Sequence, residues 1–146
     1  MAAQRTAEVT WRGSLLEGSG RIESVGSGAF GGLEVTWASR AEPEESGRTS
    51  PEELIAAAHA ACFSMALSNG LAKAGAPPES LNVAATVTFV PGTGITASAL
   101  VVEGRVPGIT EDAFREAAEQ AKDGCPVSGA LKGNVELSVT ARLASG

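Results

Sequence analysis

Residues 49–75 read TSPEELIAAAHAACFSMALSNGLAKAG and predict one long, largely apolar helix. Ser50 is a suitable N-cap, Pro51 fits the first helical position, and Glu53 completes a capping box with Ser50. Gly75 is expected to end the helix, because glycine adopts the left-handed conformation without steric cost. The start and the end of this helix are therefore both encoded in the local sequence.

The segments on either side of this helix alternate between apolar and polar residues, which is typical of strands. We expect three strands before it, a hairpin after it, a second helix that follows Thr110, and a last strand. The predicted strands cover residues 4–11, 21–25, 33–38, 81–90, 95–105 and 135–143, the second helix covers residues 111–123, one helical turn covers residues 127–132, and residues 40–48 form a polar loop. The order βββ-α-ββ-α-β predicts an α+β protein with a single domain over residues 1–146.

Composition places the chain among ordinary globular proteins. A chain of 146 residues, 43% of them hydrophobic, suits one domain with a real core. The net charge of −6 and the eleven scattered basic residues disfavour nucleic acid as a partner, because phosphates require a basic surface.

No apolar run approaches the roughly 20 residues that a membrane-spanning helix needs. The first residues, MAAQRTAEVTW, also lack the apolar core and the cleavage pattern of a secretion signal. We therefore expect a cytoplasmic protein without a membrane partner.

Small apolar side chains surround the predicted central helix. They are Ala56, Ala57, Ala58, Ala60, Ala61, Ala66 and Ala72. A helix that is apolar all round needs cover on every side, and a domain of this size has few elements that could provide it. We therefore expect a second copy of the chain to supply the missing cover, in an obligate homodimer.

The chain has two cysteines, Cys62 near the middle of the central helix and Cys125 directly after the second helix. They form no C-x-x-C motif, and a zinc site is hard to build from two cysteines and the single histidine, His59. A structural disulfide is disfavoured in a cytosolic protein. Inert burial and redox chemistry remain as the two interpretations of these cysteines.

Cys62 would need help from elsewhere in the fold to react as a thiolate. At the reference pKa of a thiol, only about 3% is ionised at pH 7. Cys62 lies roughly three turns beyond the helix start, where the effect of the helix dipole is nearly spent. The candidate activating groups are His59, Arg21, Arg40 and Arg48, although a structural histidine and surface arginines are the simpler interpretations.

Two long motifs resemble the OsmC/Ohr family. AAAHAACFSMAL (56–67), preceded by GRTSPEELI (47–55), is similar to the nucleophile helix of that family. AKDGCPVSGALKGNVELSVTARL (121–143) is similar to its second-cysteine segment and closing strand, and VPGITEDAF (106–114) lies between the two. The H-A-A-C-F form resembles the OsmC branch rather than the organic-hydroperoxide-resistance branch.

The resemblance implies an OsmC-like fold and a thiol-dependent peroxidase. It implies an intertwined homodimer whose active sites lie at the subunit interface. By resemblance, Cys62 is the peroxidatic cysteine, Cys125 is the resolving cysteine, and Glu52 orients an arginine that stabilises the thiolate. Arg40 is the expected arginine and Arg21 is its rival, because the two branches place this residue differently.

The resemblance also implies the reactants. Organic hydroperoxides are the expected substrates, hydrogen peroxide is a poorer one, and an external dithiol of the lipoyl type is the expected reductant. A Cys62 sulfenic acid and a Cys62–Cys125 disulfide would be the intermediates. No metal, haem, flavin or other cofactor is required.

The spacing of Glu52 and Cys62 predicts how the site is assembled. The two residues are ten positions apart on one helix, which is roughly 15 Å along its axis. One arginine can hardly contact both within a single chain, unless it runs along the helix. If two central helices pack antiparallel, Glu52 of one chain can approach Cys62 of the other, so we expect composite active sites.

Three functions are consistent with these residues. The first is the peroxidase, in which Phe63 and Met65 would line an apolar pocket that favours alkyl hydroperoxides. The second is a stress-induced, non-catalytic binding or structural dimer with inert buried cysteines. The third is a disulfide oxidoreductase acting on proteins, which the missing C-x-x-C motif disfavours.

Overall fold

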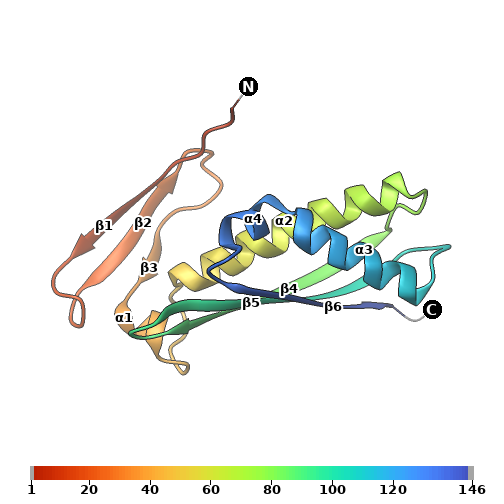
Figure 1. The fold of residues 1–146 in the computed structure, drawn as a ribbon. Coiled ribbons are helices and arrows are strands. Elements are labelled where there is room, and N and C mark those ends of the chain that lie inside the picture. The colour runs from red at the N-terminus through yellow and green to blue at the C-terminus, as the bar shows by residue number, and fades with distance from the viewer. Residues whose placement is uncertain (1, 145–146) are drawn as a thin grey trace. The chain divides into compact units, whose positions relative to one another are not determined.

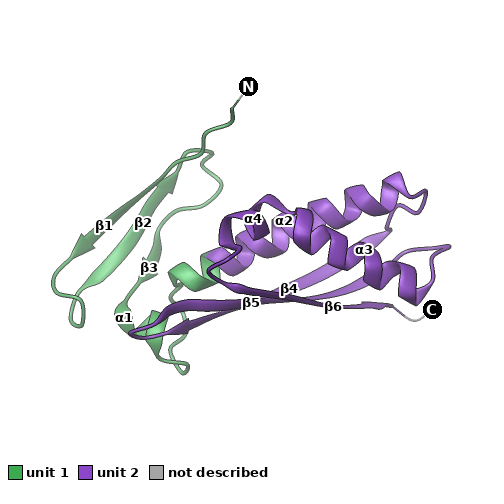
Figure 2. Ribbon diagram, viewed as in Figure 1, with its two compact units in different colours: residues 1–54 green, residues 55–146 purple. Residues whose placement is uncertain are grey.

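The structure is a computed structural model that describes residues 2–144, so the ends of the predicted domain, residues 1 and 146, lie outside the described residues. It has mixed α and β elements in the order β1 (Ala7–Arg12), β2 (Ser19–Val25), β3 (Leu33–Val35), α1 (Trp37–Ala41), α2 (Pro51–Lys73), β4 (Ser80–Val90), β5 (Gly94–Arg105), α3 (Glu111–Gly124), α4 (Pro126–Leu131) and β6 (Glu136–Leu143) (Figure 1). The chain divides into two compact units, residues 1–54 and 55–146, and the boundary falls inside α2 (Figure 2). The predicted α+β class is confirmed, with two small sheets and one long helix.

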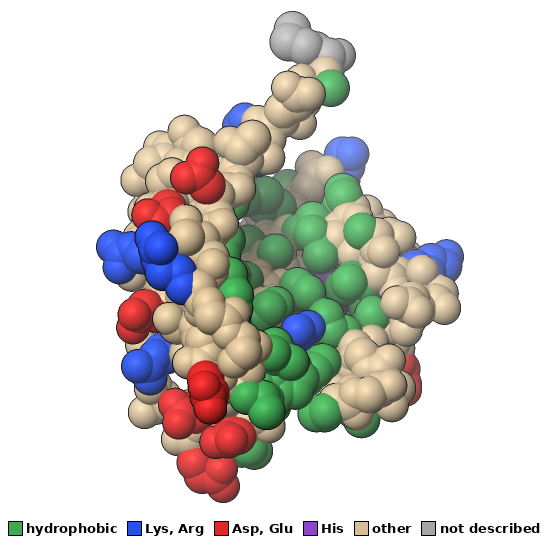
Figure 3. Space-filling view, turned by 90° about the vertical axis from the view of Figure 1, so that its left-hand side faces the viewer, with side chains coloured by type: hydrophobic (Ala, Val, Ile, Leu, Met, Phe, Trp, Pro, Cys, Tyr) green, Lys and Arg blue, Asp and Glu red, His purple; other side chains and the backbone are tan. Residues whose placement is uncertain are grey.

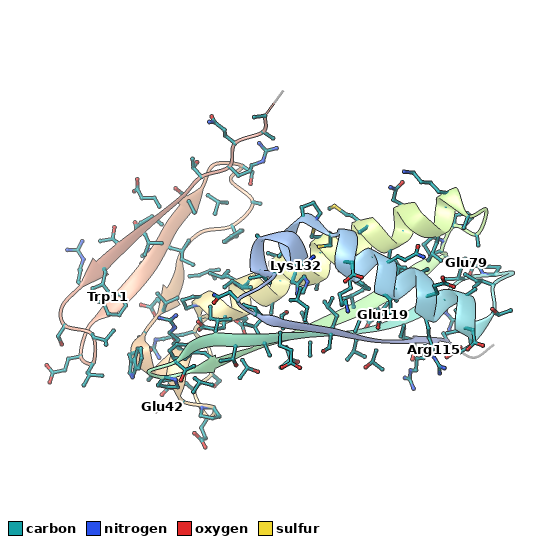
Figure 4. All side chains as sticks on the ribbon, in the orientation of Figure 1. Trp11, Glu42, Glu79, Arg115, Glu119 and Lys132 are labelled. Atoms are coloured by element: carbon teal, nitrogen blue, oxygen red, sulfur yellow. The ribbon has the colours of Figure 1, made fainter. Side chains whose placement is uncertain are left out.

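The first unit contains an antiparallel meander with the strand order β1-β2-β3. Trp11, labelled near the end of β1 in Figure 4, pairs with Gly20 of β2, and Gly20 pairs with Val35 of β3. A β-carbon at Gly20 would lie 2.7 Å from the Trp11 ring and 2.9 Å from Val35. Gly20 therefore makes room for the indole ring on this face of the sheet.

A short helix, α1, replaces the end of the predicted third strand and the start of the predicted loop. Thr36 is its N-cap: the Thr36 hydroxyl accepts the amide of Ser39 at 3.0 Å, and the Ser39 hydroxyl accepts the amide of Thr36 at 2.9 Å. This reciprocal capping box satisfies two amides that a helix start would otherwise leave open. The expectation of a strand over residues 33–38 was therefore wrong from residue 36 onward.

The second unit contains a sheet with the order β4-β5-β6. The predicted hairpin is β4 and β5, while β6 pairs parallel to β5 after the crossover through α3 and α4. Helices α2 and α3 cover the same face of this sheet (Figure 1). The core between them contains Phe63, Leu67 and Leu71 of α2, Leu100 and Val102 of β5, and Phe114, Ala118 and Ala121 of α3.

Helix α2 has the local start and end that the sequence predicts. The Ser50 hydroxyl accepts the Glu53 amide at 3.1 Å, but the Glu53 carboxylate accepts the Thr49 hydroxyl at 2.8 Å instead of the Ser50 amide. The capping box is therefore half formed. Gly75 follows the helix with a φ of 84°, in the left-handed region that favours glycine.

Within one chain, α2 buries a single stripe rather than its whole circumference. His59, Phe63, Leu67 and Leu71 are buried at helical spacing, whereas Ala57, Ala58, Ala61 and Met65 are exposed. Other exposed hydrophobic side chains include Val9, Trp11, Leu15, Leu16, Phe30 and Leu33, and hydrophobic side chains are visible at the surface in Figure 3. The described part of the chain therefore leaves one face of its central helix uncovered.

Helix α2 also corrects the expectation that no apolar segment reaches the length of a membrane span. Its 23 residues and a mean hydropathy of 1.4 over 18 residues satisfy that criterion by length and composition alone, since alanines fill much of the helix. The core helix of a soluble protein passes the same test. In this chain 22% of that window is buried, on the side that carries Phe63, Leu67 and Leu71.

Candidate active site

The two cysteines, far apart in the sequence, lie together in the second unit. Cys62 is in the middle of α2, and Cys125 joins the end of α3 to the start of α4. Both are free thiols that hydrogen-bond to each other. Cys125 is fully buried in the core, whereas Cys62 is partly exposed and packs against that core. The structure therefore brings together the two sulfurs that the sequence singles out.

Cys125 is held in place from both sides. Its amide donates to the carbonyl of Ala121 at 2.9 Å, which closes α3, and its carbonyl accepts the amide of Gly129 at 3.0 Å, which opens α4. Pro126 occupies the first position of α4, where the absence of an amide proton costs nothing. The glycine–cysteine–proline sequence thus fixes the direction of the Cys125 side chain.

Negative charge is favoured on Cys125 rather than on Cys62 within a single chain. Burial raises the pKa of Cys62, its hydrogen bond with Cys125 raises it further, and the Val127 amide offsets only part of this. Burial also acts to raise the pKa of Cys125, but hydrogen bonds from Cys62, from the Ser128 amide and hydroxyl, and from Val127 together lower it. These amides act from the start of α4, although no side-chain cap bond of standard geometry forms there.

An arginine–glutamate pair forms in the first unit. The Arg40 Nε donates to both carboxylate oxygens of Glu52, at 3.0 and 3.2 Å, and one terminal nitrogen of Arg40 lies 3.0 Å from Oε2 of Glu52. Glu52 is buried in the first turn of α2, and Arg40 belongs to α1, the helix that sequence analysis missed. Arg21 instead pairs with Glu23, 3.6 Å away, on an exposed part of β2. Arg40 rather than Arg21 is therefore the partner of Glu52.

His59 is fully buried and has a partner on each ring nitrogen. Its Nδ1 lies 2.6 Å from the Ser98 hydroxyl on β5, and its Nε2 lies 2.8 Å from the Ser128 hydroxyl on α4. Both serines are also fully buried, and burial lowers the pKa of His59, so the ring is neutral near pH 7. Sequence analysis missed both serines. The signal was present for Ser98, because the alternation of β5 places it on the inward face.

The expected pocket around Phe63 and Met65 does not form as predicted. The Phe63 side chain is fully buried in the core, so it cannot line an accessible pocket, and the expectation for this residue was wrong. Met65 is 73% exposed, on the uncovered face of α2. Residues that share one helix face are three or four positions apart. Phe63 and Met65 are two positions apart, so their side chains point in different directions.

The groups in this site can carry thiol–disulfide chemistry. Two adjacent free thiols can lose two electrons to an oxidant and form a disulfide. Groups of three or more His, Cys, Asp or Glu residues that could hold a metal ion do not occur among residues 2–144.

Comparison with known proteins identifies relatives over nearly the whole chain. The family model described as "OsmC-like protein" matches residues 43–140. The protein named Peroxiredoxin OsmC from Escherichia coli (strain K12) is 41% identical over 140 residues, which cover 94% of this chain and 96% of that protein. An organic hydroperoxide resistance protein from Xanthomonas axonopodis pv. citri is 34% identical over 98 residues, covering 63% of this chain and 66% of that protein.

Solved structures share the fold. An organic hydroperoxide resistance protein from Elizabethkingia anophelis has a TM-score of 0.72 and 25% identity, with 99% of this chain and 100% of that chain covered. The organic hydroperoxide resistance protein OhrB of Bacillus subtilis has a TM-score of 0.65 and 26% identity, with 94% and 98% covered.

Proposed function

This chain belongs to the OsmC-like family, and we propose that it is a cysteine-based peroxidase that reduces organic hydroperoxides. The observation that carries this proposal is the pairing of Cys62 with Cys125 in a chain 41% identical to Peroxiredoxin OsmC. The similarity to Peroxiredoxin OsmC covers 94% of this chain and so extends over both compact units, which supports one functional domain over the whole chain. We also propose that it is a soluble enzyme of the cytoplasm.

In the first step, the Cys62 thiolate attacks the terminal oxygen of the hydroperoxide. The oxygen–oxygen bond breaks, an alkoxide leaves and takes up a proton to become an alcohol, and Cys62 becomes a sulfenic acid. The exposures support this assignment, because Cys62 is partly exposed and Cys125 is 1% exposed. A peroxide therefore reaches Cys62 more easily than Cys125. Hydrogen peroxide would react in the same way but lacks the apolar group that favours binding.

In the second step, Cys125 resolves the sulfenic acid. The Cys125 sulfur loses its proton and attacks the Cys62 sulfur, and the hydroxyl leaves with a proton as water. The product is a Cys62–Cys125 disulfide. An external dithiol, for which we propose a lipoyl group, then reduces this disulfide to two thiols and becomes oxidised itself.

Activation of Cys62 requires a group beyond its immediate surroundings in the second unit. Burial raises the pKa of Cys62, and among the described residues only the Val127 amide acts to lower it. We assign the activating role to Arg40, held by Glu52, from the second chain of a homodimer. Two antiparallel α2 helices would place Glu52 of one chain near Cys62 of the other, despite the roughly 15 Å between them along one helix.

The uncovered apolar surface supports the homodimer. Ala57, Ala58, Ala61 and Met65 form an exposed apolar face on the part of α2 that belongs to the second unit, and the first unit has exposed hydrophobic side chains of its own on β1 and β3. Apolar surfaces of this kind mark interfaces between subunits. In this arrangement, the central helix is the core of the dimer and carries its nucleophile.

The test is peroxide consumption driven by lipoamide or dithiothreitol. We expect Cys62→Ser to lose all turnover, because no other residue forms the sulfenic acid. We expect Cys125→Ser to consume about one equivalent of peroxide and then stall or overoxidise, since the sulfenic acid has no resolving partner. The wild-type protein, assayed beside the two variants, supplies the reference turnover.

A second candidate function is a non-catalytic binding or structural dimer, which the full burial of Cys125 favours. In that case the two cysteines are inert core residues. Turnover that is unchanged in Cys62→Ser would support this candidate and overturn the peroxidase.

A further inference from the structure

Two residue pairs face each other between α2 and α4. His59 and Cys62 are three positions apart on α2 and therefore share one helix face. Cys125 and Ser128 are three positions apart as N-cap and third residue of α4, positions whose side chains approach each other at a helix start. The His59 Nε2 lies 2.8 Å from the Ser128 hydroxyl, and the two thiols hydrogen-bond beside them. Four buried or partly buried side chains therefore form one closed group.

Either neutral tautomer of His59 fits these distances, and one of the two leaves the Ser128 proton available to Cys125. A neutral imidazole has one donor and one acceptor nitrogen. When Nδ1 accepts the Ser98 hydroxyl, Nε2–H donates to the Ser128 oxygen, and the Ser128 hydroxyl proton is free to point at the Cys125 sulfur. Every buried side-chain nitrogen and oxygen among the described residues has a hydrogen-bond partner, and this tautomer leaves none of them unpaired.

We infer that His59 and Ser128 are positioning residues for the resolving cysteine, with Ser128 donating to the Cys125 sulfur and His59 holding Ser128 in that orientation. This inference rests on the proposed function, because it concerns the resolving step. The site is buried, and a hydrogen bond to a thiolate is stronger where water is excluded. The lowered pKa of Cys125 agrees with such a donor.

The positioning pair acts on the second step of the reaction and not on the first. Cys125 must release its proton before its sulfur attacks the Cys62 sulfenic acid, and the proton leaves with the hydroxyl as water. A donor at Cys125 favours the thiolate and so accelerates disulfide formation. It makes no contact with the hydroperoxide, so oxidation of Cys62 should be unaffected.

The histidine offers a pair of matched variants. His59→Gln places an amide nitrogen where Nε2 was and can still donate to Ser128. His59→Asn keeps a polar atom where Nδ1 was, within reach of Ser98, but cannot reach Ser128. Ser128→Ala removes the donor to Cys125. Ser64→Ala is the control, because the Ser64 hydroxyl on the same helix donates only to the Ala60 carbonyl, at 2.7 Å.

The first measurement is a single turnover, in which Cys62 oxidation and disulfide formation are followed separately with one equivalent of cumene hydroperoxide. We expect disulfide formation to slow about tenfold in Ser128→Ala and His59→Asn, as for loss of one hydrogen bond to a charged group. Oxidation of Cys62 should stay within about twofold of the wild type, and His59→Gln and Ser64→Ala should form the disulfide at nearly the wild-type rate.

The second measurement does not depend on peroxidase activity. The ultraviolet absorbance of the Cys125 thiolate is titrated with pH in a Cys62→Ser background, after circular dichroism shows that each variant is folded. The midpoint should rise by about one pH unit in Ser128→Ala and His59→Asn, which is a tenfold loss of thiolate at a given pH below the midpoint. His59→Gln should restore the original midpoint.

Two outcomes would overturn the inference. One is a folded Ser128→Ala variant with an unchanged Cys125 midpoint. The other is an equal effect of Gln and Asn at position 59, because this would make His59 a packing residue only. If peroxide fails to oxidise Cys62 in the wild type, the proposed function fails, while the titration still decides the inference.

Discussion

At the scale of single residues, the surroundings of Cys62 do not by themselves explain the reactive role that we propose for it. Burial raises its pKa, and Cys125 competes with it for the negative charge. A thiolate is the nucleophile in peroxide reduction, so in the proposed dimer a cation would reach Cys62 from the second chain. Arg40 is the arginine that the sequence analysis favours, and the structure holds it in an ion pair with Glu52.

Replacing Arg40 tests this activation. In a Cys125→Ser background, so that Cys62 alone is measured, Arg40→Ala should raise the Cys62 pKa by about one unit and slow alkylation by iodoacetamide near pH 7 about tenfold. The matched control is Arg21→Ala, which removes an exposed arginine paired with Glu23 and should leave the alkylation rate unchanged. Slower alkylation in Arg21→Ala, with no change in Arg40→Ala, would move the activating role to Arg21.

At the scale of elements, helix α3 packs on β5 at a glycine. Gly104 of β5 lies under Phe114 of α3, and a β-carbon there would be 2.6 Å from Cζ of Phe114 and 3.1 Å from Leu81. This close approach lets α3 lie flat against the sheet, and α3 leads directly to Cys125. The packing of α3 therefore also sets the position of Cys125, the proposed resolving cysteine.

Gly104→Ala should destabilise the protein by about 1–3 kcal/mol, because the added methyl group overpacks the contact with Phe114. The measurement is urea unfolding followed by circular dichroism. Gly70→Ala on α2 is the comparison, because a β-carbon there meets no heavy atom within 4 Å. Alanine is the better helix former, so this variant should increase the free energy of unfolding by about 0.5–1 kcal/mol. A Gly104→Ala variant as stable as the wild type would show that α3 can shift away from the sheet.

At the scale of the whole molecule, the described residues leave apolar surface exposed to solvent. The exposed face of α2 is the main example, because it is made of alanines and Met65 along the helix that carries Cys62. A second chain on this face would cover the apolar surface and, in the proposed arrangement, bring the arginine. Stability and activity would then depend on the same interface.

Ala61→Glu should therefore convert a dimer into a monomer in analytical ultracentrifugation and abolish peroxide turnover. Burying an unpaired carboxylate is costly enough to weaken the dimer at least about 100-fold. Ala113→Glu, at an exposed position in the acidic first turn of α3, is the control and should leave both the mass and the turnover unchanged. A monomeric wild-type protein with full turnover would contradict the composite site.

The sequence by itself determined the elements that depend on neighbouring residues. The limits of α2 follow from Ser50, Pro51 and Gly75, and the strands follow from their alternation, because caps, turns and side-chain direction act over a few residues. The sequence did not predict helix α1, because its capping box has Ser39 at the position where glutamate is usual. The family motifs singled out Cys62 and Cys125 for the same reason, since they are local patterns.

Only the tertiary structure decided which distant groups meet. It paired β6 in parallel with β5, placed Cys125 against Cys62, and surrounded His59 with Ser98 and Ser128, which are 39 and 69 positions away. It also selected Arg40 over Arg21 as the partner of Glu52, and buried Phe63 in the core. Such contacts depend on how helices pack on a sheet, and local propensity carries no information about which face a distant segment will cover.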